Sequence, residues 1–231
     1  MLNVSDVFKS YRGSPVLENV SFEIPEGAIA GIIGPNGAGK STVLKIVTGF
    51  EAGDRGAVYF RGTKVGSFHE RVGLFSYMPE HVEIYPDYYV RDFIAFIQKA
   101  TRYENRRLIE KLNLGLVWDK KIMNLSKGYK QRLKLFTALS NEKPFLVLDE
   151  PFDGFDPIQL QVILDLIQQE NKQGRGFLLS IHQLNDAEKI CDHYILLSDG
   201  RVIAQGALDT LRRRFGDDDS TLEEIFIVAL R

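Results

Sequence analysis

Alternating apolar and polar residues open the chain and predict paired strands. Residues 2–8 and 16–24 alternate in this way on either side of a Gly-Ser-Pro turn sequence, which predicts two half-buried antiparallel strands. Residues 28–33 form an unbroken apolar run instead, as expected for a strand that is buried on both faces of a parallel sheet. Similar apolar runs follow at residues 145–148, 177–180 and 194–197.

Between these runs, apolar residues recur at helical spacing. It occurs in residues 40–48, 90–99, 105–112, 126–139, 156–170 and 185–190. Strands that alternate with helices predict βαβ units and a mostly parallel sheet. Asp199 and Gly200 lie between two apolar runs and predict a β-hairpin at the end of that sheet. Residues 81–143 show helical patterns and no convincing strand, so we expect a helical lobe inserted into the sheet domain.

Composition narrows the class of protein. With 231 residues, 44% of them hydrophobic and 26% charged, the chain has enough material for one globular domain. Its formal charge of −2 provides no global basic field, which argues against nucleic acid as a partner. The lone cysteine, Cys191, has no Cys or His partner at zinc spacing, and we expect it to be a small buried side chain.

Membrane and secretion signals are missing from the sequence pattern. No run approaches the roughly 20 apolar residues that a bilayer span needs. Residues 1–6 lack the basic and apolar regions of a signal peptide. We therefore expect a cytoplasmic chain whose membrane work is done by a partner.

The segment GPNGAGKS lies between the first buried strand and a helix and matches the phosphate-loop spacing GxxxxGKS. Its glycines let backbone N–H groups surround phosphate oxygens, and the following helix adds its positive end. Lys40 can reach the β and γ oxygens, and Ser41 offers a hydroxyl to Mg²⁺. A plain glycine-rich turn is the alternative, and a kinase, a GTPase or a helicase can carry the same loop. The expected ATP-binding residues here are Gly34, Pro35, Asn36, Gly37, Ala38, Gly39, Lys40, Ser41 and Thr42.

An acidic pair, Asp149 and Glu150, follows the apolar run at residues 145–148. In a doubly wound sheet this end of the strand faces the ligand. We expect Asp149 to hold the Mg²⁺ shell and Glu150 to polarise the attacking water as a general base. Guanine recognition predicts an NKxD segment, and the nearest candidate, residues 171–174, reads NKQG, which disfavours a GTPase.

A family resemblance appears at residues 125–132, which read LSKGYKQR and resemble the LSGGQ signature of ABC ATPases. Tyr11 matches the aromatic that stacks on adenine in that family, and residues 76–80 match the Q-loop. Residues 153–156 match the D-loop, and His182 matches the switch histidine. With the phosphate loop and the acidic pair, these motifs occur in the family's order and cover essentially the whole chain.

The resemblance implies a fold, namely an α/β P-loop NTPase with a mostly parallel central sheet, an N-terminal antiparallel β subdomain and an inserted helical lobe. It implies one ABC ATPase domain over residues 1–231. The RecA-like core with the antiparallel subdomain is expected at residues 1–80 and 144–231. The helical lobe, which carries the signature, is expected at residues 81–143.

The resemblance also implies a composite site in which two ATPase subunits enclose two ATP molecules. Each ATP would lie between the phosphate loop of one subunit and the signature of the other, so hydrolysis would depend on closure of the dimer. His182 is expected to contact the γ-phosphate while Glu150 contacts the water. The signature residues expected to face the partner's ATP are Ser126, Lys127, Gly128 and Tyr129, and the D-loop residues are Asp153 and Asp156.

Several positions depart from the family pattern. Glu80 stands where Gln is usual, Lys127 and Tyr129 replace the signature's first Gly and its Gln, and Asp153 replaces a Ser. Glu80 can still ligate Mg²⁺ through oxygen, but its charge near the γ-phosphate is expected to lower affinity or slow turnover. The expected metal ligands are Ser41, Glu80 and Asp149.

Glu80 after Tyr-Met-Pro and the segment at residues 221–226 resemble the drug and antibiotic branch of ABC exporters. That branch keeps its membrane helices on separate polypeptides. The resemblance therefore implies integral membrane permease subunits and a second ATPase subunit, identical or different, as partners. It also implies ATP and Mg²⁺ as ligands and a peripheral place on the inner face of the cell membrane.

Aromatic residues gather where the family docks a coupling helix of the membrane subunit. They are Tyr85, Tyr88 and Tyr89, beside Pro86, and they fit either a docking surface or the core of the lobe. Two other functions stay open from the sequence. One is a soluble ABC ATPase not tied to transport, and the other is a weakly active regulatory subunit.

Overall fold

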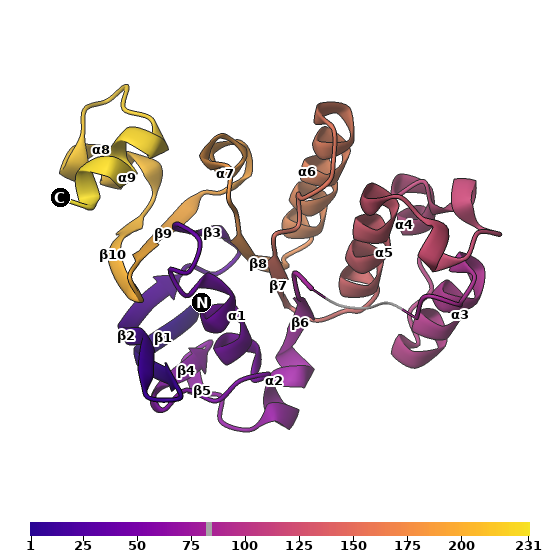
Figure 1. The fold of residues 1–231 in the computed structure, drawn as a ribbon, viewed down its shortest axis with the longest axis horizontal. Helices are drawn as coiled ribbons and strands as arrows, with labels where there is room; N and C mark the ends of the chain where they lie inside the picture. The colour runs from indigo at the N-terminus through magenta and orange to yellow at the C-terminus, as the bar shows by residue number, and fades with distance from the viewer. Residues whose placement is uncertain (82–84) are drawn as a thin grey trace.

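An antiparallel sheet forms one layer of the protein, in a computed structural model that describes residues 1–81 and 85–231 (Figure 1). Its strands, in the order β2-β1-β4-β5, are β1 (Leu2–Tyr11), β2 (Ser14–Ile24), β4 (Arg55–Phe60) and β5 (Thr63–Lys64). Leu2 and Val4 of β1 and Phe22 and Ile24 of β2 are buried, and the residues between them are more exposed. The predicted N-terminal antiparallel β subdomain is confirmed.

A six-stranded sheet forms the second layer, in the order β10-β9-β3-β8-β7-β6. Its strands are β3 (Ile29–Ile33), β6 (Phe75–Met78), β7 (Phe145–Asp149), β8 (Gly176–Ser180), β9 (His193–Ser198) and β10 (Arg201–Gly206). From β9 to β6 the neighbouring strands are parallel, whereas β10 runs antiparallel to β9. The mostly parallel sheet is confirmed, and so is the hairpin at Asp199 and Gly200, whose φ angles are 47° and 72°.

The two faces of the six-stranded sheet bury separate cores. Within β7, Leu146 and Leu148 belong to one core while Phe145 and Val147 belong to the other. This follows from the alternation of side chains along a strand, and it explains why these strands read as unbroken apolar runs. One core fills the space toward the antiparallel sheet and includes Val43 and Leu44 of the first helix.

The helices cover this framework and extend it at both ends. They are α1 (Lys40–Thr48), α2 (Phe68–Leu74), α3 (Val90–Thr101), α4 (Arg106–Lys111), α5 (Lys127–Leu139), α6 (Pro157–Lys172), α7 (Leu184–Ile190), α8 (Leu208–Phe215) and α9 (Leu222–Ala229), with the 3₁₀ turns η1 (Leu114–Val117) and η2 (Ile122–Asn124). Figure 1 shows α3, α4 and α5 gathered at the right-hand end and α8 and α9 at the opposite end.

The apolar pattern missed several elements for identifiable reasons. Helix α2 has only seven residues and none of them is buried, so its apolar pattern is too short to predict a helix. It is held instead by a capping box in which Ser67 and Glu70 each accept from the other's backbone. Strands β5 and β6 have only 2 and 4 residues. One smaller prediction holds, since Cys191 is buried.

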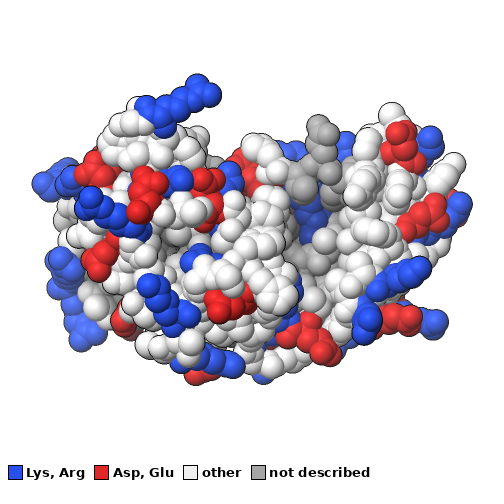
Figure 2. All heavy atoms as spheres, turned by 90° about the horizontal axis from the view of Figure 1, so that it is seen from below, with Lys and Arg blue, Asp and Glu red and all other residues white. Residues whose placement is uncertain are grey.

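Charged side chains of both signs are interspersed on the face shown in Figure 2, and neither sign dominates it. Among the helices that the structure describes, none combines the length and the apolar character needed to cross a membrane.

Candidate nucleotide-binding site

The phosphate loop joins β3 to α1 in a conformation that requires glycine at two positions. Gly39 precedes the helix with a φ of 101°, and a Cβ there would lie 2.5 Å from Leu17 Cδ2. A Cβ at Gly34 would lie only 2.1 Å from the carbonyl oxygen of Leu197. The loop therefore packs directly on the neighbouring backbone, and the first N–H groups of α1, which carry no side-chain cap, are free to meet an anion.

Lys40 lies across this loop and is 7% exposed. Its Nζ donates to the carbonyl oxygens of Gly34, at 2.8 Å, and Pro35, at 3.2 Å. Burial lowers the pKa of this ammonium, and the nearby carboxylates of Glu150, Asp149 and Glu80 act in the opposite direction. Both hydrogen-bond acceptors of Lys40 among the described residues are carbonyl oxygens, which phosphate oxygens can replace.

The acidic pair lies at the end of β7, where Ser180 from the adjacent strand β8 holds both residues. Ser180 Oγ donates to Asp149 Oδ1 at 2.5 Å and accepts from the backbone N–H of Glu150 at 2.9 Å. Asp149 is 2% exposed. Sequence reasoning gave Ser180 no role, although its place at the end of a parallel strand next to β7 was a usable signal.

Glu150 combines an unusual ionisation with an unusual backbone. Burial is the main cause that raises the pKa of its carboxyl to about 7, and Asp149 and Glu80 add to it, while Lys40 and the Ser180 hydroxyl oppose it. A pKa near neutrality suits a general base. His182 Nε2 lies 3.2 Å from Glu150 Oε1. The φ angle of Glu150 is 49°, a left-handed conformation that costs a non-glycine residue roughly 1–2 kcal/mol.

One cavity of about 430 Å³ brings together nine of the predicted residues, from the phosphate loop, Glu80, Glu150 and His182. Its walls are Val16, Asn36, Gly37, Gly39, Lys40, Ser41, Thr42, Glu80, Glu150 and His182. Val16, at the start of β2, was not predicted as a site residue, because nothing in its strand pattern separates it from other half-buried positions. Asp149 does not reach the cavity wall and lies behind it with Ser180.

Tyr11 stands apart from this wall at the end of β1 and is 40% exposed. Lys9 Nζ lies 5.1 Å from the centre of its ring. Lys9 is fixed in turn by Glu51, at 2.8 Å, and by the carbonyl oxygen of Ala52, at 2.8 Å. One face of the Tyr11 ring therefore meets a cation, which leaves the other face as a possible stacking surface.

The signature and D-loop residues pack on each other, away from the phosphate loop of the same chain. Ser126 is the N-cap of α5 and accepts from the backbone N–H of Tyr129 at 3.4 Å. Lys127 Nζ lies 2.7 Å from Asp153, and Asp156 caps α6. A Cβ on Gly128 would lie 3.1 Å from the carbonyl oxygen of Gly154. The structure does not bring the signature to this chain's own phosphate-loop cavity.

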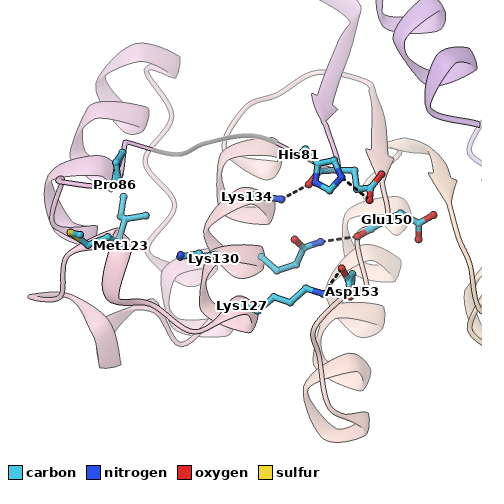
Figure 3. A pocket seen from close by; sticks show the side chains of 11 residues that line it. His81, Pro86, Met123, Lys127, Lys130, Lys134, Glu150 and Asp153 are labelled. Atoms are coloured by element: carbon cyan, nitrogen blue, oxygen red, sulfur yellow. Dashed lines mark hydrogen bonds and ion pairs between the residues drawn. The ribbon is translucent and has the colours of Figure 1, made fainter.

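A second cavity, of about 500 Å³, adjoins the first, because Glu80 and Glu150 line both. Helix α5 forms one side of it with Lys127, Lys130, Gln131 and Lys134. Figure 3 shows Lys127 extending from α5 to Asp153, whereas Lys130 points to the side of Met123 and Pro86. Gln131 also was not predicted as a site residue, since its position in α5 matched the helical pattern without indicating a contact.

A groove of about 890 Å³ exposes apolar side chains beside α2 and the end of α3. Phe50 is 60% exposed and Phe68 53%, and their rings meet edge to face. Tyr85 and Tyr88 do not line this groove. They stack on each other and are also exposed. The alternative that these tyrosines form the core of the lobe is therefore wrong.

The donor atoms at the first cavity fit a magnesium nucleotide. Within residues 1–81 and 85–231, no cluster of three or more His, Cys, Asp and Glu side chains could hold a metal ion. The oxygen donors nearby are the Ser41 hydroxyl and the carboxylates of Glu80 and Asp149. Mg²⁺ is commonly bound in this way, through one or two carboxylates completed by substrate phosphates.

These features define a class of protein. A glycine-dependent phosphate loop, a buried lysine across it and a carboxylate with a pKa near 7 in the same cavity are the parts of a P-loop nucleoside triphosphatase.

The comparisons with known proteins narrow this class to a family. The family model described as "ABC transporter" matches residues 17–153. The lantibiotic transport ATP-binding protein SrtF of Streptococcus pyogenes is 31% identical, over 98% of this chain and 96% of SrtF. The solved ATP-binding subunit of an ABC transporter superposes with a TM-score of 0.90 at 32% identity, covering all of both chains. A dimeric bacterial ABC transporter cassette superposes with a TM-score of 0.79 at 25% identity, over 90% of this chain and 99% of the cassette.

The chain belongs to the ABC transporter family. It is an ATP-binding and ATP-hydrolysing subunit of such a transporter, as the resemblance of its motifs predicted.

Proposed function

We propose that this chain hydrolyses Mg²⁺-bound ATP in the cavity lined by the phosphate loop, with Glu150 as the general base. The observation that carries this is the convergence of Lys40, Ser41, Glu150 and His182 on one cavity. Glu150 accepts the proton of the attacking water, and its pKa of about 7 keeps much of it ionised at neutral pH. His182 lies close enough to Glu150 to contact the γ-phosphate beside it.

Lys40 and the backbone N–H groups between Gly34 and Thr42, except at Pro35, which has none, bind the phosphates in this proposal, and Tyr11 stacks on the adenine. Lys40 would exchange its two carbonyl acceptors for β- and γ-phosphate oxygens. Bound Mg²⁺ would neutralise charge on the β- and γ-phosphates. Ser41, Glu80 and Asp149 are the residues that would hold it, and Asp149 would act through its inner position beside Ser180.

The proposal includes a second ATPase subunit that completes the site. Ser126 and Gly128 are not among the residues that line the phosphate-loop cavity of their own chain, which supports a role toward the ATP of a partner. A dimeric state of a related cassette supports this arrangement. Each of the two ATP molecules would lie between one phosphate loop and the other subunit's signature, with the D-loop residues Asp153 and Asp156 at the interface.

Membrane partners and the direction of transport form the next part of the proposal. The groove beside Phe50 and Phe68, together with the exposed Tyr85 and Tyr88, offers apolar surface to a helix of an integral membrane permease. Docking there would place the chain at the inner face of the cell membrane. The similarity to SrtF supports export. We divide the chain accordingly into a core, residues 1–80 and 144–231, and a helical lobe, residues 81–143.

Phosphate release by the purified protein tests this function. Wild type is expected to release phosphate from Mg²⁺-ATP, and Glu150→Gln is expected to slow release by roughly 100-fold or more, because a general base commonly contributes that much. Glu104→Gln, the same change at an exposed position before α4, is the control and should match wild type. If Glu150→Gln releases phosphate at the wild-type rate, the assigned base is wrong.

A further inference from the structure

One face of α5 makes polar contacts to three loops of the catalytic region. Lys127 pairs with Asp153, Gln131 Nε2 donates to the backbone carbonyl oxygen of Glu150 at 2.8 Å, and Lys134 Nζ donates to that of Glu80 at 2.5 Å. Positions 127, 131 and 134 are spaced by four and three residues, so they share one side of the helix. Figure 3 shows the three contacts side by side.

The central contact differs from the other two in burial. Gln131 is 7% exposed and Glu150 8%, whereas the side chains of Lys127 and Asp153 are 70% and 54% exposed. An exposed pair of that kind contributes little, because water and ions screen it. A buried amide that donates to a buried carbonyl is held more firmly, since neither group has water as an alternative partner.

Hydrogen bonds therefore hold the backbone of Glu150 at both its N–H and its C=O. Its N–H donates to Ser180 Oγ of β8, and its C=O accepts from Gln131 of α5. Between these two hydrogen bonds the residue keeps the left-handed φ of 49°, which a glutamate adopts only when its surroundings impose it. Ser180 belongs to the central sheet, so Gln131 is the contact by which α5 fixes this backbone.

We propose that Gln131 is a positioning residue for the reaction, which holds Glu150 in the strained conformation that aims its carboxylate into the phosphate-loop cavity. Because Gln131 belongs to α5 and Ser180 to the sheet, the aim of the base then depends on where α5 lies relative to the sheet. A displacement of α5 would release Glu150 without touching the phosphate loop. This inference rests on the proposed role of Glu150 as base.

Gln131→Met tests the proposal, because methionine keeps the length of the side chain and removes the donor. We expect kcat for ATP to fall about 10-fold, the effect of one hydrogen bond of ordinary strength. The KM for ATP should stay within about twofold, since no contact to the phosphate loop changes. The matched control is Gln161→Met on α6, which removes the same donor from an exposed contact to Asp165 and should leave kcat unchanged.

A double variant separates positioning from general loss of packing. In the Glu150→Gln background, Gln131→Met should cause no further loss, because the group that it positions is already absent.

The outcomes of these experiments test the proposed function and the role of Gln131 separately. A wild type that releases no phosphate overturns the proposed function itself. If wild type is active, Glu150→Gln is impaired and Gln131→Met keeps the wild-type kcat, only the role of Gln131 is overturned. The same holds if Gln131→Met causes an equal loss of kcat in the Glu150→Gln background. If Gln131→Met does not fold, Gln131→Asn takes its place, since it keeps the amide but shortens the reach by about 1.5 Å, and it should show the same loss of kcat.

Discussion

Replacing Glu150 with glutamine is expected to stabilise the fold while it stops turnover, and the gain should grow with pH. The ionised carboxylate is buried at 8% exposure, and burial is the first cause of its raised pKa. Glutamine has the same shape and carries no charge. The variant therefore resembles the protonated wild type at every pH.

The magnitude follows from the two pKa values. The carboxyl titrates at 4.5 when it is unperturbed and at about 7 in the folded protein. Between these values the folded state binds more protons than the unfolded state, so the free energy of unfolding falls as pH rises through this window and the loss is complete above it. A difference of about 2.5 pKa units corresponds to about 3 kcal/mol at pH 8, and to less than about 1 kcal/mol at pH 5.

Denaturant unfolding at both pH values measures this effect directly. We expect Glu150→Gln to exceed wild type in free energy of unfolding by about 3 kcal/mol at pH 8, and by much less at pH 5. Glu104→Gln, at an exposed position, controls for the general effect of removing one negative charge. Equal differences at the two pH values, or a variant less stable than wild type at pH 8, would refute the reasoning about Glu150.

Two further predictions concern catalysis and base recognition. The kcat of wild type should fall as pH drops below about 7, because the base is protonated there, and a profile that stays flat from pH 6 to 8 would argue against Glu150 as the base. Tyr11→Ala should raise the KM for ATP by roughly 5- to 100-fold, by analogy with stacking on nucleic-acid bases. Competition by inorganic tripolyphosphate, which has no adenine, should not change in that variant, and a parallel loss would place Tyr11 outside base recognition.

The sequence predicted those parts of the site whose spacing is set by local geometry. The segment from Gly34 to Ser41 is a loop followed by a helix, so its chemistry is contained in consecutive residues, and the structure places it as expected between β3 and α1. Asp149 and Glu150 were found in the same way, because the end of a buried strand is visible in the apolar pattern.

Contacts between distant segments could not be predicted in this way. Gln131 and Glu150 are 19 positions apart, and Ser180 and Glu150 are 30 apart. Their hydrogen bonds depend on how α5 and β8 pack on β7, which periodicity does not specify. The same limit applies to the left-handed backbone of Glu150, whose φ angle of 49° follows from the contacts around it and not from the apolar pattern.

The charged residues that depart from the family pattern lie close to residues of opposite charge in the structure. Lys127 and Asp153 both differ from the usual residues, and in the structure they form an ion pair with each other. Glu80 likewise lies near a cation, because Lys134 donates to its backbone and the Glu80 charge acts to raise the pKa of Lys134 against the effect of burial. The unusual charges are thus partly compensated within the chain.

Complementation between two inactive variants tests the composite site most directly. Lys40→Ala removes the phosphate-loop lysine, and Ser126→Asp keeps an N-cap for α5 but places a negative charge where the signature should meet the partner's ATP. Each variant alone is expected to release little phosphate. In an equal mixture with random pairing, about half of the dimers contain one copy of each variant, and each of these mixed dimers has one intact site out of two. About a quarter of all sites are then intact, so about a quarter of wild-type activity should return. A mixture no more active than the two variants separately would contradict a site shared between two copies.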